Sequence, residues 1–150
     1  MGMFSQTAEY ALRAAIALAQ EGDRSLTTDE LAVRTKVPRG YLSKVLQQLH
    51  KGGVVRAIRG IYGGYALCRP PGDITMIEVV NAVDPIQRIH TCPLNLPEHG
   101  DCLCPLHQRM DRALAEVERA FSETTLEEVV QEPSLSTPLC PWPGGWNMES

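Results

Sequence analysis

Residues 37–69 constrain the fold most, because a helical pattern is followed directly by a glycine-rich hairpin pattern. The helical half carries apolar residues at i, i+3, i+4 and i+7, which gives a helix one buried face: Leu42, Val45, Leu46 and Leu49. Gly52 and Gly53 end this pattern, and two β-type runs follow at residues 54–58 and 64–68. A helix followed by such a hairpin predicts a recognition helix with a wing.

Charge along the chain supports a nucleic-acid-binding surface in the same region. The chain has 14 Lys and Arg against 18 Asp and Glu, a net charge of −4. Residues 31–72 nevertheless contain 8 basic residues and no acidic one, so this window carries +8 and the remaining 6 basic and 18 acidic residues carry −12. A basic segment in an acidic chain is typical of a surface that binds phosphates. A solvated basic surface without a ligand is the simpler alternative.

Further helices are expected on both sides of this region. Residues 5–20 form an alanine-rich pattern with one apolar face. Pro38 fits the first position of the recognition helix, where its missing amide is not needed. Capping boxes, in which a Thr precedes a Glu by three residues, predict the start of two more helices at Thr27 with Glu30 and at Thr75 with Glu78. The predicted fold class is therefore mainly α with a small β wing, a winged helix-turn-helix domain over residues 3–84.

The second half of the chain predicts a loop, a long helix and a tail. Residues 85–104 are too interrupted by Pro and Gly for regular structure, and residues 132–150 have the composition of a flexible tail. Between them, residues 105–131 contain a long helix and a short final one. An apolar stripe with steps of three and four residues predicts that the long helix mediates dimerisation: His107, Met110, Leu114, Val117 and Phe121. Packing of this helix on its own domain is the alternative.

The five cysteines indicate metal or redox chemistry rather than a disulfide framework. If Pro105 is the first residue of the long helix, Cys104 is its N-cap, where the helix dipole favours a thiolate. Cys92, Cys102 and His107 lie close by in the sequence, but thiolates and imidazoles bind iron-sulfur clusters and zinc alike. The spacing therefore leaves a cluster, zinc and free thiols open. Cys68, at the end of the second wing run, is predicted to be a small buried residue.

The recognition-helix and wing residues resemble those of the bacterial Rrf-two family of winged helix-turn-helix transcription regulators, which includes IscR, NsrR, RsrR and CymR. The matching pattern is Tyr41-Leu42-x-x-Val45-Leu46-x-x-Leu49-x-Lys51-x-Gly53-x-Val55, then Arg59-Gly60-x-x-Gly63-Gly64-Tyr65-x-Leu67. The resemblance extends from about residue 4 to residue 130, and the wing is its specific part. It implies a homodimer, not an enzyme, that represses transcription at a near-palindromic site on double-stranded DNA. The N-terminus lacks a basic region followed by a hydrophobic one, which predicts a cytoplasmic protein.

The resemblance also implies site residues. The DNA-binding set consists of Thr28, Arg39, Gly40, Tyr41, Ser43, Lys44, Gln47, Arg56, Arg59 and Tyr62. Many members of the family sense redox state, nitric oxide or iron-sulfur status through a cluster in the loop after the DNA-binding domain. Here the implied cluster ligands are Cys92, Cys102, Cys104, His107 and, from the partner subunit, Glu9. Cys102 and Cys104 are closer together than is usual in the family, which leaves 2Fe-2S and 4Fe-4S clusters open.

Three other functions are possible for a chain with these features. A regulator of the same class could use zinc or free thiols in place of a cluster. A protein-interaction adaptor could use the same fold, since winged helices also bind proteins. A small redox enzyme using Cys102 and Cys104 has little support, because no general base or substrate-binding pattern accompanies them. No apolar run reaches membrane-spanning length, so a membrane partner is not expected.

Overall fold

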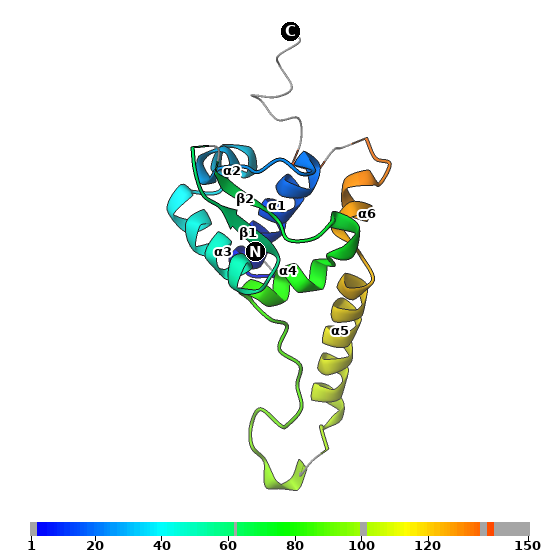
Figure 1. The fold of residues 1–150 in the computed structure, drawn as a ribbon. Helices are drawn as coiled ribbons and strands as arrows, with labels where there is room; N and C mark the ends of the chain where they lie inside the picture. Colours follow the sequence, from blue (N-terminus) through cyan, green and yellow to red (C-terminus); the bar gives the residue numbers. More distant parts are fainter. Residues whose placement is uncertain (1–2, 62, 100–101, 136–137, 140–150) are drawn as a thin grey trace.

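The structure is a computed structural model that describes residues 3–61, 63–99, 102–135 and 138–139 of the chain. Its elements in chain order are α1 (Gln6–Glu21), α2 (Thr28–Thr35), α3 (Arg39–Lys51), β1 (Val55–Ile58), β2 (Gly64–Leu67), η1 (Pro71–Asp73), α4 (Met76–Val83), η2 (Pro97–His99), α5 (Pro105–Ser122) and α6 (Leu126–Gln131). Figure 1 shows a body made of α1–α4, the hairpin and α6, from which the loop after α4 and the helix α5 extend as an arm. The predicted fold class, mainly α with a small β wing, is confirmed.

The helix starts follow the capping residues. Thr27 accepts a hydrogen bond from the amide of Glu30 at 3.1 Å, and the Glu30 side chain accepts one from the amide of Thr27 at 3.0 Å. Thr75 and Glu78 form the same reciprocal pair at the start of α4. The prediction for Pro38 is wrong by one residue. Pro38 is the N-cap of α3, because its ψ of 134° is extended, and the helix begins at Arg39.

The wing is a two-stranded antiparallel sheet. Val55 pairs with Leu67 at its base and Ile58 with Gly64 at its tip. Tyr65 also exchanges two backbone hydrogen bonds with Leu26, at 2.9 and 2.8 Å, which ties the hairpin to the segment before α2. Gly64 has a φ of +143°, and a Cβ on it would overlap the backbone of Leu26. Glycine is therefore required where the wing approaches the body.

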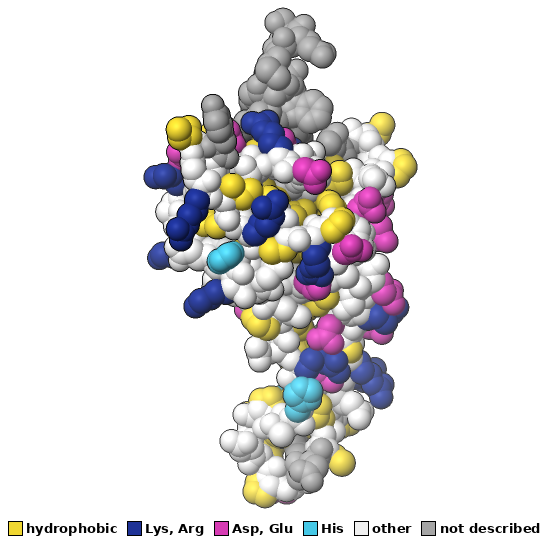
Figure 2. Space-filling view, in the orientation of Figure 1, with side chains coloured by type: hydrophobic (Ala, Val, Ile, Leu, Met, Phe, Trp, Pro, Cys, Tyr) yellow, Lys and Arg dark blue, Asp and Glu magenta, His cyan; other side chains and the backbone are white. Residues whose placement is uncertain are grey.

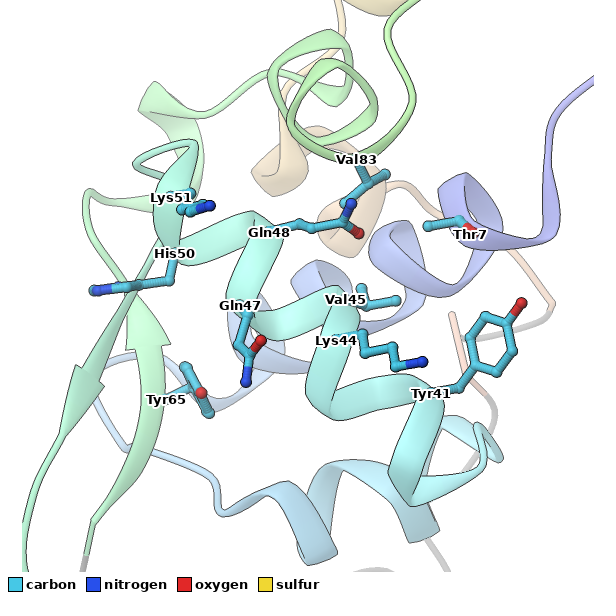
Figure 3. Close-up of a pocket in the computed structure, with 10 residues that line it drawn as sticks. All are labelled: Thr7, Tyr41, Lys44, Val45, Gln47, Gln48, His50, Lys51, Tyr65 and Val83. Atoms are coloured by element: carbon cyan, nitrogen blue, oxygen red, sulfur yellow. The ribbon is translucent and has the colours of Figure 1, made fainter.

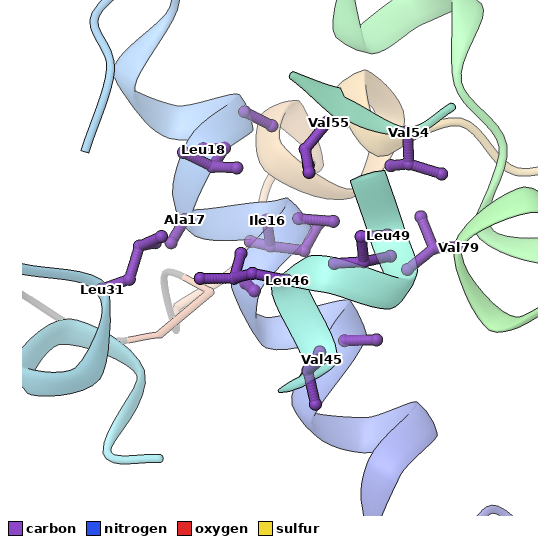
Figure 4. Packing of buried hydrophobic residues seen from close by; sticks show 14 of the residues in the cluster. Ile16, Ala17, Leu18, Leu31, Val45, Leu46, Leu49, Val54, Val55 and Val79 are labelled. Carbon is purple, nitrogen blue, oxygen red and sulfur yellow. The ribbon is translucent and has the colours of Figure 1, made fainter. Parts of the chain in front are cut away.

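The core of the body lies between α1, α3, β1 and α4. Ala11, Ala14 and Ala15 of α1 are fully buried, and their small side chains let the neighbouring helices approach closely. Leu46 and Leu49 of α3 pack into the same cluster, as Figure 4 shows. The apolar stripe predicted for the recognition helix is confirmed, since Leu42, Val45, Leu46 and Leu49 are at most 1 % exposed.

The arm is anchored to the body at its C-terminal end. The amide of Met76, at the start of α4, donates to the carbonyl of Thr124 at 2.9 Å, and the amide of Leu126 donates to the carbonyl of Ile74 at the same distance. The rings of Phe4 and Phe121 stack with centroids 5.1 Å apart. Helix α5 begins at Pro105 with Cys104 as its N-cap, as predicted. Of the helices that the structure describes, none is long and apolar enough to cross a membrane.

The last described residues return to the body. The carbonyl of Pro138 accepts a hydrogen bond from Gln20 Nε2 at 2.8 Å, and Leu139 packs against the core. Gln20 lies near the end of α1, so this contact joins residues 118 positions apart. The other residues of the predicted tail from 140 onwards lie outside the described part of the chain.

Candidate nucleic-acid interface and cysteine loop

One face of α3 is open to solvent, opposite its buried stripe. Five of the predicted DNA-binding residues are exposed on it: Arg39, Gly40, Tyr41, Lys44 and Gln47. Ser43 is half-buried, and its hydroxyl donates to the carbonyl of Arg39 at 3.1 Å. Along this face runs a groove of about 670 Å³, shown in Figure 3, which is bounded by Thr7 of α1, Val83 of α4 and Tyr65 of the wing. The open face of the helix is therefore framed by three other elements.

The sequence-based set missed three residues that line this groove. Gln48, His50 and Lys51 are exposed on α3 and form part of its wall. The ring of His50 is held in place, since its Nδ1 lies 3.2 Å from the carbonyl oxygen of Val55 and donates to it. The helical period that separates the buried stripe from the open face already placed Gln48 and Lys51 on the open face.

Some basic side chains of residues 31–72 form ion pairs with acidic residues, and others do not. Lys36, Lys44, Lys51, Arg56 and Arg59 form no ion pair with any residue that the structure describes. By contrast, Arg34 has a side chain only 7 % exposed and pairs with Glu21, and Arg69 pairs with Glu78. The positive charge that a bound ligand would meet is therefore smaller than the +8 counted over residues 31–72.

The open basic residues gather on the side of α3 and the wing. Figure 2 shows Lys and Arg side chains there, whereas Asp and Glu side chains gather over α6 and α5. Arg39 belongs to the basic side but is 2.5 Å from Asp29, with both side chains about two-thirds exposed. Arg56 and Arg59 are exposed on the wing, and Thr28, the first residue of α2, is half-buried. Tyr62, also predicted to bind DNA, lies outside the described residues.

The cysteine loop brings together only part of its predicted ligand set. Cys104 Sγ lies 3.3 Å from His107 Nδ1, one helical turn along α5. Cys102 is exposed, and Cys92 is only 6 % exposed. Within the described ranges, the structure gathers no group of three or more His, Cys, Asp or Glu side chains that could hold a metal ion.

Glu9, the predicted ligand from α1, has a partner in its own helix. Its Oε1 accepts a hydrogen bond from Arg13 Nε at 3.0 Å, and both side chains are about one-third exposed. The contact with Arg13 therefore uses one of the two carboxylate oxygens of Glu9.

Cys68 is exposed, so the prediction that it is buried is wrong. Its amide still donates to the carbonyl of Val54 at 2.9 Å, but its side chain borders a solvent-open hollow lined by Arg56 and Pro71.

Helix α5 divides its apolar residues between its own domain and solvent. Leu114 and Val117 border a hollow of about 260 Å³ beneath Phe4 and Val80, and Phe121 stacks on Phe4. Three of the predicted dimer residues thus face their own domain in part. Met110 is 48 % exposed, and Leu106 and Ala113 are exposed beside it. These three residues follow an i, i+4, i+7 spacing and form one open apolar stripe.

A clamp that the sequence did not reveal joins the loop to α5. Arg88 donates two hydrogen bonds to Asp111, at 2.7 and 2.8 Å, and a third to Glu118 at 3.4 Å. The amide of Ile89 donates to Asp111 at 2.9 Å. The hydrogen bonds from Arg88 and from this amide hold the pKa of Asp111 well below its usual range, and the bonds to Asp111 raise that of Arg88. The clamp fixes the start of the loop against the middle of α5.

A helix-turn-helix followed by a two-stranded wing with an open basic face defines the winged-helix class of transcription regulators. The model of the Rrf2 (Rrf-two) family, described as an iron-dependent transcriptional regulator, matches residues 4–132. The chain belongs to this family, as its resemblance indicated, and is a transcription regulator of the Rrf2 type.

Similar proteins agree with this assignment. An HTH-type transcriptional regulator of Aquifex aeolicus is 30% identical over 131 residues, covering 85% of this chain and 91% of that protein. One from Mycobacterium tuberculosis is 35% identical over 131 residues, covering 83% and 79%.

Among solved structures, CymR of B. subtilis, the global cysteine regulator, has a TM-score of 0.73 at 24% identity and covers 89% of this chain and 100% of CymR. IscR of T. potens has a TM-score of 0.67 at 23% identity and covers 85% and 86%. At this level of identity, the solved structures support the fold.

Proposed function

We propose that this protein is a homodimeric repressor that binds double-stranded DNA at a near-palindromic operator. Residues 3–84 form the DNA-binding domain, residues 85–104 a sensor loop, and residues 105–131 the dimerisation helix with the final helix. The observation that supports DNA binding most directly is the open basic face of α3 and the wing, where Lys44, Arg56 and Arg59 have no acidic partner among the described residues.

The roles of the residues follow from their places on this face. Lys44 and Gln47 lie on the open side of α3, where side chains reach base edges or phosphates when the helix enters the major groove. Arg39, Gly40, Tyr41 and Ser43 occupy its N-terminal part, and Thr28 starts α2 beside it. Arg56 and Arg59 on the wing would contact the phosphate backbone or the minor groove. Tyr62 is part of the same proposal on sequence grounds.

Selection of bound duplexes from a random-sequence pool, followed by affinity measurements against salt, tests this function. Log K against log[salt] should fall with a slope of about −0.9 per phosphate contact. Lys44→Ala and Arg59→Ala should each weaken binding, and a lost phosphate contact should reduce the slope by about 1. Arg112→Ala, which removes an exposed charge from α5, is the matched control and should bind like the wild type. Failure to enrich any duplex would contradict the proposal and favour an adaptor.

The open stripe of α5 supports the homodimer. Leu106 is 62 % exposed and Met110 48 %, so two copies paired along this face would remove both side chains from water. Leu114, Val117 and Phe121 would continue the interface where it meets the body. A two-fold dimer would place its two recognition helices roughly 34–36 Å apart, or a multiple of that distance, on the two half-sites.

An iron-sulfur cluster in the loop is the sensor that the donor types support best. Cys104 and His107 are already adjacent, Cys92 and Cys102 lie in the same loop, and Glu9 of a second copy would complete the set through its other carboxylate oxygen. Thiolates and imidazoles are ligands of such clusters, and the family description is iron-dependent. A bound cluster would supply iron that reacts with oxidants or nitric oxide. Because the Arg88 clamp ties the loop to α5, ordering of the loop would act on the dimer helix.

Iron analysis and visible absorption of anaerobically purified protein test the sensor. The wild type should be coloured and contain iron, and Cys92→Ala and Cys104→Ala should abolish both. Cys102→Ala and Glu9→Ala would show which donor completes the site. Cys68→Ala is the matched control, since Cys68 lies at the end of the wing and should not affect iron content. Colourless protein that contains zinc, or no metal after reconstitution, would contradict the cluster and indicate the zinc or thiol alternative.

A further inference from the structure

We propose that Arg13 is a positioning residue for the recognition helix, which fixes the N-terminal end of α3 through the α2–α3 turn and through the Tyr10–Tyr41 ring pair. The proposal rests on the DNA-binding function proposed above. Arg13 lies in the middle of α1, and its guanidinium makes three contacts at once. Nε donates to Glu9 at 3.0 Å, Nη1 donates to the carbonyl of Thr35 at 3.2 Å, and Cζ lies 5.4 Å from the centroid of the Tyr10 ring.

The first route from Arg13 to α3 passes through the turn of the helix-turn-helix. Thr35 is the last residue of α2, where the carbonyl groups have no partner within the helix. A cation is favourable at this end of a helix because of the helix dipole. The next residue, Lys36, is left-handed at φ 58° and ψ 36° and turns the chain towards Pro38. By binding Thr35, which is 2 % exposed, Arg13 fixes the point from which α3 starts.

The second route passes through two aromatic rings. Tyr10, beneath the guanidinium of Arg13, meets Tyr41 edge-to-face, with centroids 5.7 Å apart and an angle of 84° between the rings. Both cation–π and edge-to-face contacts are attractive and directional. Tyr41 lies in the first turn of α3 and lines the groove seen in Figure 3. Arg13 thus reaches the first turn of the recognition helix as well as the turn before it.

Both routes end on the part of the helix that matters most for reading sequence. In helix-turn-helix proteins the N-terminal residues of the recognition helix contact base edges. The side chain of Arg13 is 31 % exposed, and Glu9 neutralises its charge. Arg13 therefore acts through the position of Tyr41 and its neighbours, so its loss should reduce sequence-specific binding more than general affinity for DNA.

The test compares Arg13→Met and Arg13→Lys with Arg24→Met in the full chain. Arg24 is the matched control because it also belongs to an ion pair with a glutamate on α1 but contacts neither Thr35 nor Tyr10 in the described contacts. Affinity is measured for the duplex that the wild type selects and for random-sequence duplex, at one salt concentration. Arg13→Met should lose on the order of tenfold in affinity for the selected duplex, with random-duplex affinity and salt slope unchanged. Arg13→Lys should behave similarly, because lysine keeps the charge but lacks the planar fork.

Hydrogen exchange of the free protein gives a readout that does not depend on DNA. Residues 35–43 should exchange faster in Arg13→Met than in Arg24→Met, whereas residues 46–51 of the same helix should not differ. This region-specific effect separates positioning of α3 from a general loss of stability. If Arg13→Met lowers the two DNA affinities equally, or leaves both unchanged, the positioning role is refuted. Uniformly faster exchange along α3 would refute it too. If the wild type selects no duplex, the DNA-binding function fails, while the exchange comparison still decides the role of Arg13.

Discussion

The body and the arm of this molecule have different sources of stability. In the body, Leu31, Leu42, Leu46 and Leu49 have no exposed surface and form one cluster with the alanines of α1. In the arm, α5 is longer than any other helix described, yet contains no fully buried residue. The body is therefore stabilised by its own core, whereas the arm is held by a few contacts and leaves an apolar stripe open.

The difference indicates where the second copy of the proposed dimer would bind. The arm is joined to the body by the Phe4–Phe121 stack and the hydrogen bonds around Thr124, and within the arm the Arg88–Asp111 clamp holds the loop against α5. None of these covers Leu106 or Met110, which stay largely exposed. Exposed apolar stripes on a helix are typical of an interface. Changes in the body should therefore affect folding, and changes in the arm should affect assembly.

The largest expected effect is the loss of a core side chain from the body. Leu46→Ala removes buried methyl groups and leaves a cavity, so the free energy of unfolding should fall by about 2–5 kcal/mol. Denaturant unfolding at fixed protein concentration measures it. Gln47→Ala, at the next and exposed position of the same helix, should change the free energy of unfolding by less than about 0.5 kcal/mol. Similar losses in both variants would mean that α3 is not the central packing element.

The next effect concerns assembly. Met110→Asp places a charge in the open stripe of α5 and should convert the proposed dimer to monomers, as measured by light scattering, while the circular dichroism of the body is retained. Gln108→Asp is the matched control, since it adds the same charge two residues away on the opposite side of the helix. A Met110→Asp protein that stays dimeric would show that the interface lies elsewhere.

The smallest effect concerns the clamp, because its side chains are partly exposed. The folded protein holds the pKa of Asp111 below its usual value. The clamp therefore makes its full contribution to stability when the pH is above about 3.9, the pKa of an Asp side chain in the unfolded protein. Its contribution declines as the pH falls from that value towards the lower folded one. Asp111→Asn should therefore lower Tm at neutral pH, and the gap to the wild type should narrow below about pH 4.

The matched control for the clamp is Glu116→Gln, which breaks an exposed ion pair with Arg119 on the same helix. Its Tm should equal that of the wild type at neutral pH. A constant difference between Asp111→Asn and wild type down to pH 3 would show that Asp111 acts through packing and not through its charge.

Local patterns predicted the elements of the body well. The capping boxes of Thr27 and Thr75 and the stripe of α3 depend on residues three or four positions apart, and the structure confirms them. The two wrong predictions concern residues at the ends of elements. Pro38 is the cap and not the first residue of α3, and Cys68 is exposed at the C-terminal end of the wing.

The sequence by itself determined the helix-turn-helix, the wing and the side of α3 that is open, because helical and strand periods are local properties of the chain. Only the tertiary structure decided which basic side chains form ion pairs, since Arg34 and Arg69 pair with Glu21 and Glu78 of other elements. It alone joined Arg13 to Thr35 and Arg88 to Asp111, pairs separated by 22 and 23 residues. Such contacts depend on how helices pack against one another, and that packing leaves no repeating signal in the sequence.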